Sequence, residues 1–196
     1  MPKDFYIFRH GQSTYNVAGR TQGCTNNSVL TELGEEQARE VGQKLADYQI
    51  DVIVSSPLKR ALQTAELANQ TLHVPIVVDQ RFIEVNVGVV EGMHYTEIQK
   101  QYPEIFTQLH QSEIDKCFDV CYPQGETKRQ VQQRLWQGLN DWGRNEQNYH
   151  NIAVSSHGIA ISLVLHSFNI NVNDVKNGTI IHLREDNNQW KVIKMI

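Results

Sequence analysis

Two arginines, two histidines and a glutamate stand just after apolar stretches of this chain, where a buried strand would end. These residues are Arg9, His10, Arg60, Glu84 and His157. In open α/β sheets, ligands gather beyond the carboxyl ends of the strands. If the apolar stretches are neighbouring parallel strands, we expect the five side chains to meet in one crevice.

Such a set suits the transfer of a phosphoryl group. Guanidinium groups bind phosphate oxygens through paired N–H donors, so we predict that Arg9, Arg60 and His157 hold the phosphate. The histidines and cysteines show no metal-ligand spacing, and we expect neither a metal nor another cofactor. A neutral imidazole is a competent nucleophile, the role predicted for His10. Glu84 is the predicted proton donor to the leaving oxygen.

Each of these residues also has a structural interpretation when it is taken alone. His157 could be a capping or core histidine, Arg60 a solvated helix residue, and Glu84 an ordinary loop carboxylate. Only their joint placement favours chemistry. The other six histidines lack metal-ligand spacing and are expected at the surface or in packing contacts: His73, His94, His110, His150, His166 and His182.

Alternating strands and helices must position the candidate residues. The pattern predicts strands over 4–8, 51–55, 74–78 and 152–155, helices from Thr31 onward and over 58–72, 126–145 and 158–167, and a hairpin from 179–184 and 190–195. This order is typical of an α/β fold with three layers, α/β/α, and a mostly parallel central sheet. The stretch 93–124 breaks the alternation, and we expect it to be a small helical insertion over the active site of one domain, 1–196.

Local signals add detail to these elements. Thr31 is the expected N-cap of the first long helix, whose apolar side includes Leu33, and Pro57 suits the first turn of the next helix. Glu126 is expected at the start of a helix, where a carboxylate is favourable. Cys117 and Cys121 are four residues apart and could share one helix face.

Composition narrows the class of protein. With 196 residues, 40% of them hydrophobic, the chain can bury a core, which excludes a disordered protein. A net charge of −4 argues against a nucleic-acid partner. No apolar run approaches the roughly 18 residues of a membrane span, and the amino terminus lacks a signal-peptide pattern. The odd number of cysteines, 3, suggests free thiols in a reducing cytoplasm.

Five sequence blocks also resemble a known family in type and order. They are RHGQSTYN at 9–16, SSPLKRALQTA at 55–65, FIEVNVGVVEG at 82–92, PQGET at 123–127 and SSHG at 155–158. Together they are similar to the histidine phosphatase superfamily, in the branch related to cofactor-dependent phosphoglycerate mutases. The resemblance covers nearly the whole chain and implies a phosphoglycerate mutase-like fold.

The resemblance also implies roles for individual residues. His10 corresponds to the nucleophile that becomes phosphohistidine, and Glu84 to the proton donor that later activates water. Arg9, Arg60 and His157 correspond to the phosphate pocket. Further substrate-binding residues are expected at Asn16, Gln22, Gly23 and Gly158.

Departures from the mutases favour hydrolysis. Val87 stands where the mutases have a tyrosine, Tyr95 where they have a lysine, and no arginine lies between Arg81 and Arg129 to hold a second anion. We therefore expect a metal-independent phosphomonoester hydrolase for small phosphorylated metabolites. The alternatives are a cofactor-dependent phosphoglycerate mutase and a non-catalytic phosphate-binding regulatory module. Phosphoserine, sugar phosphates and ribazole-type phosphates remain open as substrates, and the prior favours a homodimer.

Overall fold

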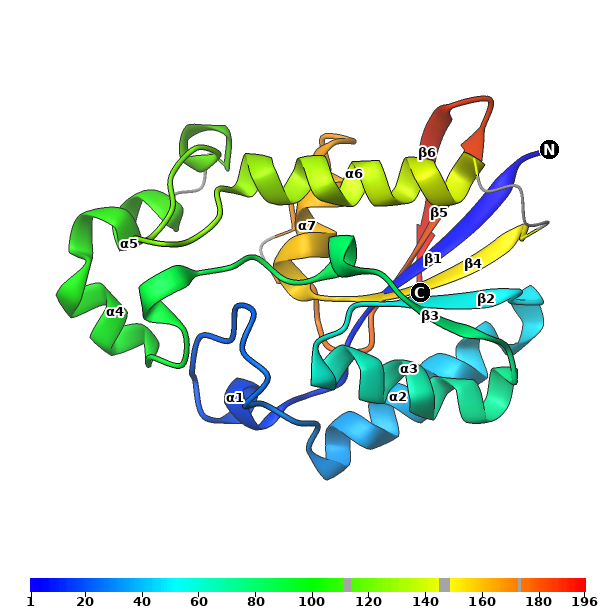
Figure 1. Cartoon of the computed structure of the whole chain (residues 1–196), viewed down its shortest axis with the longest axis horizontal. Helices are drawn as coiled ribbons and strands as arrows, with labels where there is room; N and C mark the ends of the chain where they lie inside the picture. The colour runs from blue at the N-terminus through cyan, green and yellow to red at the C-terminus, as the bar shows by residue number, and fades with distance from the viewer. Residues whose placement is uncertain (111–113, 145–148, 173) are drawn as a thin grey trace.

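A six-stranded mixed sheet forms the centre of the protein (Figure 1). The computed structural model describes residues 1–110, 114–144, 149–172 and 174–196. The strands are β1 (Lys3–Arg9), β2 (Val52–Ser55), β3 (Ile76–Val78), β4 (Asn151–Ser156), β5 (Ile180–Asp186) and β6 (Gln189–Met195). Their order is β3-β2-β4-β1-β5-β6. The first four strands in this order are parallel, and β5 and β6 form an antiparallel hairpin beside β1. The expected mostly parallel sheet is confirmed.

Alternating side chains along the strands build two apolar layers. On β1, Phe5 and Ile7 belong to one hydrophobic cluster, and Tyr6 and Phe8 belong to the other. Successive residues of a strand point to opposite faces, so both faces of this sheet must be covered. Helices α6 (Lys128–Arg144) and α7 (Gly158–His166) cover the first face, and α2 (Glu32–Leu45) and α3 (Lys59–Leu72) cover the second (Figure 1).

Helix starts follow local capping chemistry with two corrections. The Thr31 hydroxyl accepts from the Gly34 N–H and caps α2, as predicted. Leu33 is 48% exposed, so it does not belong to the apolar side of α2. Leu58 is the N-cap of α3, so Pro57 lies before the helix and not in its first turn.

The insertion at 93–124 contains short helices beyond the carboxyl ends of the parallel strands (Figure 1). They are α4 (Tyr95–Gln101), α5 (Pro103–Leu109) and the 3-10 helix η4 (Ile114–Cys117). Residues 111–113 of the predicted insertion lie outside the described residues. Because η4 ends at Cys117, Cys121 does not share a helix face with it, and that interpretation was wrong.

Short elements complete the fold: the helix α1 (Thr14–Val17) and the 3-10 helices η1 (Ala46–Tyr48), η2 (Gln80–Phe82) and η3 (Gly88–Val90). Within the described ranges, none of the helices combines the length and apolar character that crossing a bilayer requires. Among the described residues, Cys24, Cys117 and Cys121 form no disulfide bond.

Candidate active site

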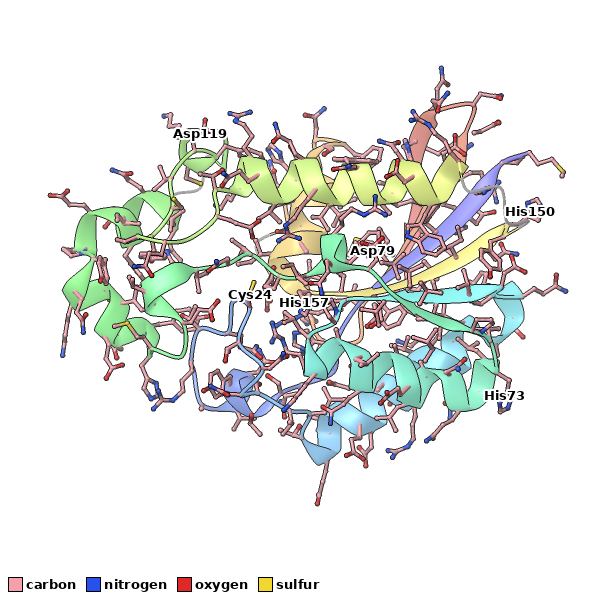
Figure 2. The ribbon with its side chains drawn as sticks, viewed as in Figure 1. Cys24, His73, Asp79, Asp119, His150 and His157 are labelled. Atoms are coloured by element: carbon pink, nitrogen blue, oxygen red, sulfur yellow. The ribbon has the colours of Figure 1, made fainter. Side chains whose placement is uncertain are left out.

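The carboxyl edge of the parallel strands opens into a cavity of about 680 Å³. β1 ends at Arg9 and β4 ends directly before His157, and these strands pair in parallel with Arg9 opposite Ser156. Every predicted site residue except His157 lines the cavity: Arg9, His10, Asn16, Gln22, Gly23, Arg60, Glu84 and Gly158. His157 is fully buried at this edge of the sheet (Figure 2), and its ring meets the His10 ring edge-on with centroids 5.2 Å apart.

The His10 ring is held in one tautomer. Its Nδ1 lies 2.7 Å from the carbonyl oxygen of Gly11, which can only accept, so Nδ1 carries the proton. Nε2 therefore keeps its lone pair and accepts from Nε of Arg60 across 3.2 Å. Burial, together with the charges of Arg60 and Arg9, holds the pKa of His10 well below its ordinary value. The ring is neutral near pH 7, as a nitrogen nucleophile must be.

Arg60 is a buried cation fixed by backbone carbonyls. Its Nη2 donates to the Gly23 carbonyl at 2.8 Å, and its Nη1 donates to the Thr25 carbonyl at 3.0 Å. Burial lowers the pKa of Arg60 to about 10, with Glu84 opposing this shift, so the guanidinium stays charged near neutral pH. This side chain ties α3 to the loop that contains Gly23.

Arg9 and His157 each have a buried nitrogen with no hydrogen-bond partner among the described residues, Nε of Arg9 and Nδ1 of His157. Nη1 of Arg9 donates to the Asp174 carboxylate at 3.2 Å and to the Val175 carbonyl. Nε2 of His157 lies 2.8 Å from the Ser56 hydroxyl. Buried polar atoms are nearly always paired. Unpaired nitrogens on both residues fit a site built to bind an anion.

Glu84 is 8% exposed and lies against the amino-terminal end of α7. One carboxylate oxygen accepts from the N–H groups of Val85 and Ala160, and the other accepts from the N–H of Ile159, at 3.0 to 3.1 Å. The first turn of a helix offers unpaired N–H groups, so α7 orients the carboxylate toward the cavity that Glu84 lines.

The expected substrate-binding residues near the amino terminus form a connected rim. The Asn16 side-chain oxygen accepts from the Ser13 N–H at 3.0 Å, within the capping box of α1. The Ser13 hydroxyl donates to the Gln22 side chain at 2.8 Å. Gly23 has a φ of +52°, and a Cβ there would lie 2.5 Å from the Glu91 carboxylate. The rim therefore requires glycine at this position.

Sequence reasoning missed several residues that support the site. Asn177 donates to the His10 carbonyl at 2.8 Å, and Arg20, which donates to the Gly92 carbonyl at 2.6 Å, lines the cavity. Arg134 donates to the carbonyl oxygens of Arg81, Ile83 and Glu84. In the sequence, Arg134 is notable only as a charged residue beside the apolar positions of an amphipathic helix. No local sequence pattern points to Asn177.

Glu126 does not begin a helix, because α6 starts at Lys128. Its carboxylate binds the guanidinium group of Arg134 at 3.0 Å, so this expectation was wrong. In the part of the chain that the structure describes, no group of three or more His, Cys, Asp and Glu side chains is arranged to hold a metal ion.

An α/β sheet whose carboxyl edge presents a neutral imidazole among guanidinium groups defines a class of phosphate-binding sites. The chain belongs to the histidine phosphatase superfamily (branch 1), whose family model matches residues 5–196. The family and the α/β fold expected from the sequence are confirmed.

Two relatives illustrate this membership. A protein of Bacillus subtilis (strain 168) named as the uncharacterized phosphatase PhoE is 38% identical over 161 residues, which are 81% of this chain and 74% of that protein. A probable phosphoglycerate mutase, GpmB, of Erwinia tasmaniensis is 32% identical over 160 residues, 82% of this chain and 72% of that protein.

Solved structures share the fold. YhfR of Bacillus stearothermophilus superposes with a TM-score of 0.86 at 25% identity, covering 97% of this chain and 95% of that chain. A phosphoglycerate mutase of Bacillus anthracis superposes with a TM-score of 0.87 at 22% identity, covering 98% and 92%. At 22% identity, the similarity to the second structure shows a shared fold and nothing more.

Proposed function

We propose that the protein hydrolyses small phosphomonoesters without a metal ion, through a phosphohistidine at His10. The observation that carries the proposal is the orientation of the His10 ring. Its protonated Nδ1 is bound to the Gly11 carbonyl, and its unprotonated Nε2 is 3.2 Å from the Arg60 guanidinium. The atom that must attack phosphorus thus lies beside a cation that can bind the phosphoryl oxygens.

In the first step, Nε2 of His10 attacks the phosphorus atom and the bond from phosphorus to the ester oxygen breaks. Arg9, Arg60 and His157 bind the non-bridging oxygens, where negative charge is concentrated. Glu84 gives its proton to the leaving oxygen, because an alkoxide is a poor leaving group. The products are an alcohol and phosphorylated His10.

In the second step, water attacks the phosphohistidine. Glu84, now a carboxylate, takes a proton from the water as the new oxygen–phosphorus bond forms. The bond between Nε2 and phosphorus breaks, and inorganic phosphate leaves with His10 restored. The Bacillus subtilis relative named as a phosphatase supports water as the acceptor.

A mutase is the second candidate, and two observations favour it. One is the relative named as a probable phosphoglycerate mutase. The other is a pair of cations in the cavity wall, Arg20 and Lys128, which the sequence reasoning did not weigh. Both are already bound to backbone carbonyls, of Gly92 at 2.6 Å and of Leu109 at 3.4 Å. Val87 and Tyr95 also line the cavity, so hydrolysis remains our preferred function.

Purified protein and two assays test the proposal. The wild type is expected to release phosphate from p-nitrophenyl phosphate, and His10→Ala is expected to lose about 10³-fold or more of this activity. With 3-phosphoglycerate, phosphate release is expected to outpace formation of 2-phosphoglycerate. The opposite order would establish a mutase. Phosphate binding without turnover over a broad panel of esters would establish a regulatory module.

The expectations about partners, location and domain organisation stay predictions. We propose a small phosphomonoester as the partner in solution, and neither nucleic acid nor membrane. A cytoplasmic location and a single domain over the whole chain are predicted from the sequence alone. The oligomeric state stays open, with a homodimer as the prior.

A further inference from the structure

We propose that Arg134, on α6, is the positioning residue that sets the place of Glu84. Its Nη1 donates to the carbonyl oxygens of Arg81 and Ile83, both at 2.8 Å, and its Nη2 donates to the carbonyl of Glu84 at 2.9 Å. One guanidinium group thus binds three carbonyls of the short segment that ends at the predicted proton donor. This inference rests on the proposed function.

Glu126 completes the arrangement on the far side of Glu84. Its two carboxylate oxygens accept from Nε and Nη2 of Arg134, both at 3.0 Å. The same carboxylate accepts from the Asn86 N–H at 3.0 Å, and the Glu126 N–H donates to the Asn86 carbonyl at 2.7 Å. The backbone is therefore fixed both before and after Glu84.

The segment needs such a support because it has no regular structure of its own. Residues 83–87 lie between η2 (Gln80–Phe82) and η3 (Gly88–Val90) and belong to no strand or helix. At the end of η2, the Ile83 N–H donates to the Gln80 carbonyl. Buried carbonyl groups without a donor would be costly. Arginine offers five donors in a planar fork, whereas lysine offers a point charge that cannot span these acceptors.

Arg134 acts through Glu84 and not on the substrate. It does not line the cavity, whereas Glu84 and Glu126 do. The α7 N–H groups fix the carboxylate of Glu84, and Arg134 fixes the backbone from which this side chain extends. A shift of this backbone would move the donor away from the leaving oxygen without disturbing the phosphate pocket.

The positioning role of Arg134 can be tested with two esters whose leaving groups differ in their need for a proton from Glu84. Phosphoserine releases an alkoxide, which needs the proton of Glu84, whereas p-nitrophenyl phosphate releases a stable phenolate that does not. Because a general acid contributes about 10²–10⁴-fold, we expect Arg134→Gln to lower kcat/KM for phosphoserine about tenfold more than for p-nitrophenyl phosphate. Arg134→Lys and Glu126→Gln are expected to show smaller differences in the same direction.

Arg129→Gln is the matched control on the same helix. Arg129 makes a two-bond pair with Asp119, at 2.7 and 2.8 Å, with side chains 53% and 68% exposed. Arg129→Gln is expected to leave kcat/KM unchanged for both phosphoserine and p-nitrophenyl phosphate. Circular dichroism checks that each variant is folded, and Arg134→Lys or Glu126→Gln replaces Arg134→Gln if that variant is not.

Equal losses on the two esters, or no loss on either, would overturn the positioning role while leaving the proposed function intact. A wild type that turns over neither ester would overturn the proposed function, and this inference with it. Loss of kcat/KM for p-nitrophenyl phosphate in His10→Ala separates the two claims, because the first step on this ester needs the nucleophile but not the proton of Glu84.

Discussion

Nε of Arg60 donates to Nε2 of His10 across 3.2 Å, so one cation binds the nitrogen that we propose as the nucleophile. This contact blocks protonation of Nε2 and keeps its lone pair directed at the guanidinium group. When a phosphoryl group approaches, the same N–H can turn to one of its oxygens, and the lone pair is released for attack. In the proposed mechanism, Arg60 therefore both prepares the nucleophile and binds the electrophile.

The first prediction concerns this pair and the pH dependence of the reaction. Burial is the main cause that lowers the pKa of His10, and the charge of Arg60 adds to it. Arg60→Gln removes that charge, so the pKa of His10 rises and the ring is protonated at higher pH. We expect kcat/KM to fall about 10²–10³-fold, and its acidic limb to move toward neutral pH.

Rates on p-nitrophenyl phosphate over a pH series measure both effects. Arg39→Gln is the control, because Arg39 is an exposed residue of α2 that pairs with Glu35 at 3.1 Å. An acidic limb at the wild-type position in Arg60→Gln would refute the electrostatic coupling between the two residues.

The architecture could be predicted because local patterns and sheet topology agree. The run Phe5–Phe8 is apolar at every position, which is typical of a strand buried on both faces. Parallel strands share one carboxyl edge, so residues at or just after the ends of separate strands, such as Arg9 and His157, could be placed together from the sequence alone.

Supporting contacts could not be predicted in the same way. Arg134 lies 50 residues from Glu84, and its role depends on how α6 packs over the loop before Glu84. The sequence around Glu126 predicts a helix start. A carboxylate that stabilises a helix start and one that pairs with a distant arginine, as Glu126 does with Arg134, cannot be told apart from the sequence. Leu33 fits helical spacing but is 48% exposed, because spacing alone does not show which apolar positions of a helix meet the rest of the protein.

A second prediction concerns the backbone contact that supports the loop after β1. A Cβ added to Gly34 would lie 2.0 Å from the Gln12 carbonyl oxygen, within the RHGQ segment. Since backbone atoms cannot yield as a flexible side chain can, Gly34→Ala is expected to destabilise the fold by about 2 kcal/mol and to lower kcat/KM. Urea unfolding measures the first effect.

Gly143→Ala serves as the comparison for this substitution. Its nearest neighbour, the Glu185 side chain, would be 3.7 Å from the new Cβ, an ordinary contact. We expect no destabilisation there, because alanine favours helices over glycine by about 1 kcal/mol. Wild-type urea midpoints in both variants would show that close packing at Gly34 does not hold the RHGQ segment.

A third prediction concerns metal removal. Arg9 and Arg60 supply the positive charge that a phosphoryl group requires, so activity on p-nitrophenyl phosphate is expected to survive treatment with EDTA. Adding Mg²⁺ to the treated enzyme is expected to change the rate by less than about twofold. Activity that EDTA abolishes and Mg²⁺ restores would contradict the metal-independent mechanism.

The last prediction links the buried histidines to stability. Burial, with the charge of Arg60, lowers the pKa values of His10 and His157 well below 6.5. As the pH falls below about 6.5, the unfolded chain therefore binds protons that the folded chain does not, and stability decreases. The expected slope is about 1.4 kcal/mol per pH unit for each histidine, down to its folded pKa.

Urea unfolding at several pH values below 6.5 measures this slope, and it must be done without phosphate or sulfate, because anions that bind the folded state would stabilise it. His10→Gln and His157→Gln are each expected to remove about half of the slope, and the double variant nearly all of it. The comparison uses slopes, so a constant change in stability caused by either substitution does not affect it. Slopes equal to that of the wild type in both single variants would mean that neither ring is kept neutral by the fold, and the nucleophile assigned to His10 would lose its electrostatic basis.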